Sequence, residues 1–253
     1  MGHVGGTRDL KGPSGVPGGY QERASRVAGA VLWSRTVQPS ARPVLPDGCT
    51  DLIWSAGRLL VAGPDTGPQS VGGVPAGTPF VGLRFAPGQG PAVFGVPARE
   101  LRDRRVPLAD LWPAGQVREL TERLAAAGEP GGTAGIGRLL EETAVARLRE
   151  GTRDDGRTAA VAAELARGRP VAEVAGAVAL SERQLHRLSL DAFGYGPKTL
   201  TRVLRLVRAL DLARSGMPYA QVAARAGYAD QAHLAREVKS LAGAPMGVLL
   251  APG

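Results

Sequence analysis

The last third of the chain contains a short segment whose side chains suit the recognition of an anionic surface. The segment SERQLHRLSLDAFGYGP begins at Ser181 and places Arg183, His186 and Arg187 on one side of a predicted helix. Leucine and phenylalanine side chains occupy another side, which is the pattern of a helix packed on a core. Guanidinium groups donate paired hydrogen bonds to phosphate and to guanine, so the segment indicates binding of an anionic partner and not catalysis.

The same arrangement occurs a second time, 49 residues further along. In DQAHLAREVKSLAGAP, the residues Gln231, His233 and Arg236 face outward, and the shift carries Leu185 onto Leu234. For one arginine alone, a solvated helix surface is the better explanation. Because the outward residues recur on two matched helices, we predict that both helices contact the edges of DNA bases.

Each of these two helices has a marked start. Ser181 is followed three residues later by Gln184, which is a capping-box pair, and Asp230 is a suitable N-cap for the second helix. A short segment rich in small residues precedes each start and ends in a turn, near Ala179 and at Gly227. A short helix, a turn and a second helix form the helix-turn-helix motif, whose second helix enters the major groove of DNA.

A further predicted helix, PKTLTRVLRLVRALDLARSG, separates the two motifs. It starts with Pro197 at a favourable first position and ends at Gly216. We expect it to hold the two recognition helices at one separation, so that they enter successive grooves about 34 Å apart. Its residues Arg202, Arg205 and Arg208 contact either phosphates or only solvent, and the sequence favours neither.

The charge of the chain points to the same kind of partner. The 253 residues include 31 Lys and Arg against 23 Asp and Glu, a formal net charge of +8. Residues 157–250 hold 13 of the basic and 7 of the acidic residues, so +6 of that charge lies in the last third. Together with the two motifs, this charge predicts double-stranded DNA as the partner.

The first part of the chain has a different composition and residue pattern. Residues 1–19 are rich in Gly and poor in large apolar side chains, so we expect a disordered tail. Residues 20–112 hold short apolar runs cut by Gly and Pro, which predicts a β-rich, cupin-like barrel or sandwich for sensing or dimerisation. Residues 113–151 have helical spacing and form a connector to a DNA-binding domain at 152–253. The predicted fold class is therefore α+β.

Three segments resemble one protein family in their order and spacing. The segments LSERQLHRL, FGYGPKTLTRVLRLVRAL and QVAARAGYADQAHLAREVKSLAGAP resemble the AraC/XylS-type bacterial transcription regulators, over residues 157–250. The resemblance implies a DNA-binding transcription factor whose recognition helices send their early residues to base edges. By motif position, the implied DNA-binding residues are Arg183, His186, Arg187, Gln231, Ala232, His233 and Arg236, with Ser181 and Lys239 nearer phosphates.

The sequence also departs from the family pattern. Ser189 and Val238 stand where the family usually has Phe, Ala179 replaces the habitual turn Gly, and Leu234 replaces the Phe that commonly follows His. These changes bear on the rigidity of the two units more than on their binding role. The N-terminal segments LPDGCTDLIW and VGLRFAPGQGPAVFGVP resemble a β-rich sensor domain that precedes such units in related actinobacterial proteins.

Other chemistries have weaker support in this sequence. With three histidines and one cysteine in the chain, we expect no metal site, no cofactor and no intramolecular disulfide. Cys49 lies between Asp47 and Asp51, whose carboxylates disfavour the thiolate that a nucleophile needs, so we expect no enzyme. Two alternatives stay open: a DNA-repair methyltransferase that uses Cys49, and a helical third that binds an acidic protein.

The sequence also bears on location and on further partners. No long apolar run or signal-peptide core is present, which predicts a cytoplasmic protein without membrane contact. Beyond DNA, the candidate partners are a small-molecule effector of the N-terminal domain, RNA polymerase and a second copy of the chain. Four aromatic residues of that domain line either its core or an effector pocket, and the core is the preferred interpretation. They are Trp33, Trp54, Phe80 and Phe85.

Overall fold

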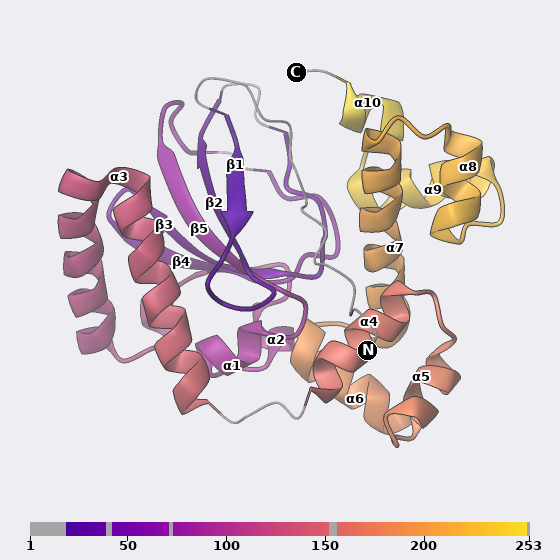
Figure 1. The fold of residues 1–253 in the computed structure, drawn as a ribbon, viewed down its shortest axis with the longest axis horizontal. Coiled ribbons are helices and arrows are strands. Elements are labelled where there is room, and N and C mark those ends of the chain that lie inside the picture. The colour runs from indigo at the N-terminus through magenta and orange to yellow at the C-terminus, as the bar shows by residue number, and fades with distance from the viewer. Residues whose placement is uncertain (1–18, 39–41, 71–72, 152–155, 252–253) are drawn as a thin grey trace, which may run out of the picture.

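The computed structural model describes residues 19–38, 42–70, 73–151 and 156–251, and comprises a sheet-based N-terminal unit and a helical C-terminal unit (Figure 1). The α+β class predicted from the sequence is confirmed. Apart from Gly19, the tail expected at residues 1–19 lies outside the described residues. Within the described ranges, no helix combines the length and the apolarity needed to cross a membrane.

Six antiparallel strands form one sheet in the N-terminal unit, in the order β1-β2-β5-β3-β4-β6. Strand β5 pairs with both β2 and β3, and Leu83 of β5 lies opposite Leu32 and Leu52 in the two ladders. Branched and aromatic residues suit such a pleated, half-buried surface. The strands are β1 Gln21–Ala24, β2 Val31–Thr36, β3 Thr50–Ser55, β4 Arg58–Ala62, β5 Pro79–Phe85 and β6 Arg105–Pro107.

The sheet is open, whereas we expected a barrel or a sandwich. Among the described strands, β1 and β6 end the order and do not pair with each other. Closing a barrel requires the two edge strands to pair with each other, and β6 has only three residues available for such pairing. Helix α3 (Ala114–Glu150) covers one face of the sheet instead (Figure 1). The second layer of this unit is therefore helical, not a second sheet.

Helix α3 reverses its direction at Gly132, where φ is 53° and the backbone is not helical. Its two arms lie side by side in Figure 1. They approach closely, because a Cβ added to Gly135 would lie 2.5 Å from the carbonyl oxygen of Ala127. Residues 113–151, expected as a connector, thus pack on the sheet as part of the N-terminal unit. Leucines of both arms join its core, namely Leu120, Leu124, Leu139 and Leu140.

The core of the N-terminal unit also takes up most of the aromatic residues singled out in the sequence. Trp54 and Phe85 belong to it, Trp33 is buried nearby, and Phe80 is half-buried at the start of β5. Three short elements complete the unit: α1 (Gly90–Phe94), α2 (Ala98–Leu101) and a 3-10 turn, η1 (Leu108–Asp110). Phe94 of α1 packs edge-on against Phe85, with ring centroids 5.7 Å apart.

The C-terminal unit has two small cores joined by one long helix, α7. One core lies around Leu185 and Val203, the other around Leu206 and Leu234, and α7 contributes to both. Helices α5 and α6 lie at one end of α7, and α8 and α9 at the other (Figure 1). The helices are α4 Arg157–Ala166, α5 Val171–Ala177, α6 Glu182–Phe193, α7 Pro197–Arg214, α8 Tyr219–Ala226, α9 Gln231–Ala242 and α10 Met246–Leu250.

Candidate nucleic-acid interface

Helix α6 begins with the capping box predicted from the sequence, which is confirmed. The Ser181 hydroxyl oxygen accepts a hydrogen bond from the Gln184 backbone N–H at 3.3 Å, and the Gln184 Oε1 accepts one from the Ser181 N–H at 2.9 Å. The Ser181 hydroxyl also donates to that Oε1, at 2.9 Å. The cap satisfies backbone donors that the first turn leaves without helical partners. Ser181, expected near a phosphate, thus has its side chain engaged within the helix start.

Helix α9 is capped in a related way. The Asp230 carboxylate accepts a hydrogen bond from the His233 backbone N–H at 2.6 Å, which confirms Asp230 as the N-cap. The turns before the two helices also match, because Ala179 and Gly227 both have positive φ, 54° and 81°. Ala179 therefore adopts the conformation for which glycine is better suited.

Both recognition helices bury one side and expose the other. Leu185 is fully buried in the first core and Leu234 is 2% exposed in the second. The opposite sides carry the residues predicted to contact DNA, and all but one of these are exposed, so a duplex could approach without unfolding of either helix. Of these predicted residues, His233 is half-buried and the rest are exposed: Ser181, Arg183, His186, Arg187, Gln231, Ala232, Arg236 and Lys239.

The two histidines have packing contacts that the sequence did not reveal. The His233 ring meets the Tyr228 ring edge-on, with centroids 5.4 Å apart, and its Nδ1 accepts a hydrogen bond from the Ala229 N–H at 3.2 Å. Because Nδ1 accepts, a neutral His233 carries its proton on Nε2. His186 lies against Gly196, where an added Cβ would be 2.7 Å from the imidazole Cε1. No metal-binding group of His, Cys, Asp or Glu side chains occurs among the described residues.

Of the three α7 arginines singled out in the sequence, two bind a carboxylate of α9, which neither sequence-based interpretation anticipated. Arg202 donates to Glu237 of α9 through Nε at 2.9 Å and Nη2 at 3.2 Å, and Arg205 Nη2 lies 3.7 Å from the same carboxylate. The hydrogen bonds from Arg202 lower the pKa of Glu237. Arg208 is exposed, so for this arginine both interpretations, contact with a phosphate and contact with solvent only, stay open. No feature of the sequence indicated Glu237 as a residue of this site.

The N-terminal unit contacts the flank of α6. Arg99 of α2 forms an ion pair with Asp191, and Arg102 donates to the carbonyl oxygen of Gly194 at 3.4 Å. The fit is close, since a Cβ added to Gly194 would lie 2.7 Å from Pro64 Cγ. The first recognition helix is therefore positioned partly by the N-terminal unit.

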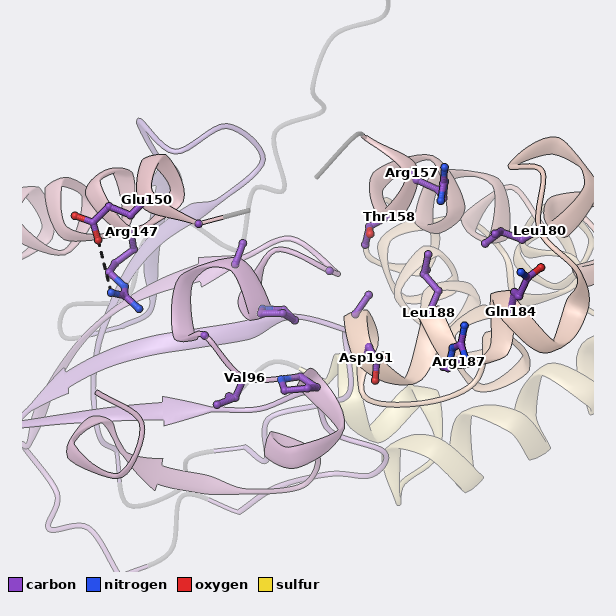
Figure 2. A pocket seen from close by; sticks show the side chains of 17 residues that line it. Val96, Arg147, Glu150, Arg157, Thr158, Leu180, Gln184, Arg187, Leu188 and Asp191 are labelled. Atoms are coloured by element: carbon purple, nitrogen blue, oxygen red, sulfur yellow. Dashed lines mark ion pairs between the residues drawn. The ribbon is translucent and has the colours of Figure 1, made fainter. Parts of the chain in front are cut away.

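A cleft of about 800 Å³ lies beside this contact. Figure 2 shows Arg147 and Glu150 of α3 on one side of the cleft, and Gln184, Arg187 and Leu188 of α6 on the other. A molecule in the cleft would touch both the N-terminal unit and a residue predicted to read a base.

The second helix-turn-helix unit has its own contact with the N-terminal unit. Arg42 donates to the carbonyl oxygen of Leu249 at 2.7 Å and also to that of Ala251. Leu45 packs against the second core. Tyr195, in the turn between α6 and α7, is buried with its hydroxyl near Gly48. The N-terminal unit thus touches both halves of the helical unit.

Cys49 lies in a half-buried polar cluster that disfavours a reactive thiol. Its backbone N–H donates to Asp47 Oδ1 at 2.9 Å, and Arg84 lies within 3.4 Å of both Asp47 and Asp51. Burial raises the pKa of the Cys49 thiol well above its usual range, and Asp47 and Asp51 raise it further against the opposing effect of Arg84. A nucleophilic thiol needs the opposite shift, so the cluster gives no support to methyl transfer by Cys49.

Comparison with known proteins agrees with this geometry. Residues 174–251 match the model of a family described as a helix-turn-helix domain. The C-terminal third is a helix-turn-helix domain of the AraC type. The match confirms the DNA-binding helix-turn-helix domain that the resemblance to AraC/XylS-type regulators implied. Residues 30–107 match a second family, described as a domain of unknown function (DUF6597).

Solved structures similar to this chain include several of ToxT from Vibrio cholerae. An apo ToxT variant from strain SCE256 is 11% identical, with a TM-score of 0.48 over 90% of this chain and 98% of that one. ToxT from strain O395 is 9% identical, with a TM-score of 0.48 over 88% and 97%. Wild-type ToxT with a bound unsaturated fatty acid is 11% identical, with a TM-score of 0.45 over 87% and 94%. No curated protein matches the chain.

Proposed function

We propose that this regulator reads one duplex with both recognition helices, α6 and α9, in successive major grooves. The observation that carries the proposal is that two capped helices with exposed basic faces lie at the two ends of one continuous helix, α7. With 18 residues, α7 is about 27 Å long, which is of the order of the 34 Å between successive grooves.

The contacts have separate roles in this proposal. Arg183, His186 and Arg187 of α6 contact base edges, as do Gln231, Ala232, His233 and Arg236 of α9. Lys239 contacts a phosphate, and Ser181 acts mainly by capping α6 while its exposed position lies near the backbone of DNA. Phosphate contacts supply affinity irrespective of sequence, and base contacts supply the selectivity.

The N-terminal unit controls this binding in the same proposal. It touches α6 through the Arg99–Asp191 pair and the second unit through Arg42, so a change in its position would move one recognition helix relative to the other. A small-molecule effector in the cleft beside Arg187 would act on that contact directly. RNA polymerase as a partner, a second copy of the chain, and the cytoplasmic location remain predictions.

Selection of random duplexes with the full-length protein tests the proposal. We expect a motif of two blocks separated by about one helical turn of DNA, with binding that weakens steeply as salt rises. A basic surface that binds an acidic protein would enrich no sequence. A selected pool without any motif, at salt concentrations where the protein still binds duplex, would therefore refute sequence-specific reading.

A further inference from the structure

We propose that Glu237 is a positioning residue that fixes the orientation of α9 on α7, and thereby the base preference of the second helix-turn-helix unit. This inference rests on the proposed function, because it concerns how one of the two recognition helices is aimed. Glu237 itself is not assigned a contact with DNA. It acts through Arg202, Arg205 and Tyr228.

The link between Glu237 and Arg202 is geometrically specific. Arg202 Nε lies 2.9 Å from one carboxylate oxygen of Glu237, and Nη2 lies 3.2 Å from the other. Two parallel hydrogen bonds between a guanidinium and a carboxylate constrain orientation as well as distance. The apolar contacts of α9, such as those of Leu234, are not directional in this way. The paired hydrogen bonds therefore limit how far α9 can rotate on α7.

Arg205 extends these contacts to the start of α9. Its guanidinium carbon lies 4.6 Å from the centroid of the Tyr228 ring, and its Nη1 donates to the Gly227 carbonyl oxygen at 3.2 Å. Tyr228 in turn meets the edge of the His233 ring. A continuous set of contacts thus runs from the carboxylate of Glu237 to the first turn of α9, where the base contacts are proposed.

The first unit is positioned differently, which makes it an internal reference. The 49-residue shift that relates the two units carries Glu237 back to Leu188, which packs against the first core. Helix α6 is held instead by Asp191, through its ion pair with Arg99 of the N-terminal unit. Loss of the Glu237 carboxylate should therefore disturb the second unit and leave the first unit as it is.

The test uses duplex selection with the full-length wild type, Glu237→Gln, and the reciprocal double variant Arg202→Glu with Glu237→Arg. Loss of one block in Arg187→Ala identifies the block that the first unit reads. We expect Glu237→Gln to lose the sequence preference of the other block and to bind the wild-type duplex about tenfold more weakly, as suits the loss of a charge-assisted pair. The reciprocal variant should regain that block.

A matched control separates this effect from a general loss of surface charge. Arg214→Gln removes an ion pair with Asp211 that lies within α7 itself, at 3.0 Å, and should leave both blocks unchanged. Thermal melting followed by circular dichroism reports whether each variant is folded. A merely stabilising role of Glu237 would lower Tm and weaken both blocks together.

The outcomes are distinct. If the wild type selects two blocks and Glu237→Gln keeps both, or loses both in parallel, the positioning role is overturned. It is also overturned if the reciprocal variant melts like the wild type but does not regain the second block. A wild type that selects no motif would instead overturn the proposed function, and the inference with it.

Discussion

Arg99 of α2 and Asp191 of α6 form an ion pair between the N-terminal unit and the first recognition helix. Both side chains are about half exposed, at 47% and 46%, so the pair itself stabilises the fold by well under about 1 kcal/mol. Its location matters more than its strength, because Asp191 lies one turn beyond Arg187, a residue proposed to read a base. The pair joins the N-terminal unit to the helix that we propose reads DNA.

We expect Asp191→Arg to weaken the docking of the N-terminal unit on α6 without unfolding either unit. Two arginines would then face each other across the contact, and like charges repel. Backbone amide exchange in α2 should become faster, whereas the free energy of unfolding should change by less than about 1 kcal/mol. The double variant Arg99→Asp with Asp191→Arg should restore slow exchange. Equal exchange in the single variant and the wild type would show that the pair does not hold the units together.

Base and phosphate contacts should respond differently to substitution. We expect Arg187→Ala to cost about 1 to 3 kcal/mol on the preferred duplex and to relax one base position. Lys239→Ala should weaken binding to all sequences alike and reduce the salt dependence by about one counterion. Mobility-shift titrations at several salt concentrations measure both effects. Unchanged affinity in Arg187→Ala would remove that residue from the interface.

The caps of the two recognition helices should each contribute measurably to stability. Ser181→Ala and Asp230→Ala both remove the side-chain acceptor for a backbone N–H, which costs about 1 kcal/mol in typical helices. Denaturant unfolding of the full-length protein measures this. Ser240→Ala, at an exposed position late in α9, is the control and should be near neutral. A cap variant as stable as this control would argue against the observed hydrogen bond.

Glu141 should make the stability of the N-terminal unit depend on pH. Burial raises the pKa of Glu141, but hydrogen bonds from the Arg23 guanidinium and the Arg26 N–H outweigh that effect, so its folded-state pKa is lowered. A lowered folded pKa gives stability that is present above the unfolded-state pKa and is lost as pH falls through the folded one.

We therefore expect Glu141→Gln to lower the free energy of unfolding by about 1 to 2 kcal/mol at pH 7. The difference from the wild type should shrink as pH falls below about 4. Glu142→Gln, at the exposed neighbouring position, is the control. Denaturant unfolding at pH 7 and at lower pH gives both values, and a difference that does not vary with pH would contradict the ionised pair.

Cys49 should behave as a packed residue. Because burial and the neighbouring carboxylates raise the pKa of its thiol, we expect thiol reagents at pH 8 to modify the native protein at least about tenfold more slowly than the unfolded chain. Cys49→Ser should bind the selected duplex as the wild type does. Rapid labelling of the native protein, or a methyl group trapped on Cys49, would revive the methyltransferase alternative.

The elements that the sequence predicted well are those fixed by neighbouring residues. The capping box of Ser181 and Gln184 spans three positions, and Pro197 marks the first residue of α7, so local chemistry determines both. The turn at Ala179 follows from the repeat, because the second unit has Gly227 at the matching place. The outward placement of the proposed DNA contacts follows from helical periodicity in the same way.

The features that the sequence did not predict depend on residues far apart in the chain. Arg202 and Glu237 are 35 positions apart, and no pattern within either helix indicates that they meet. The packing of both arms of α3 on the sheet likewise depends on the reversal at Gly132. The histidine contacts were missed because Tyr228 and Gly196 belong to turns, where side-chain directions do not follow a simple period.

The head-to-tail repeat carried by α7 has a consequence for the architecture of promoters. A chain with two different reading helices in one orientation has no two-fold axis, unlike a symmetric dimer on a palindrome. The proposed DNA site is therefore directional. Inverting the site reverses the bound protein along the DNA, so that the opposite flank of the N-terminal unit faces upstream. Regulation by a single bound copy should thus depend on which strand carries the motif.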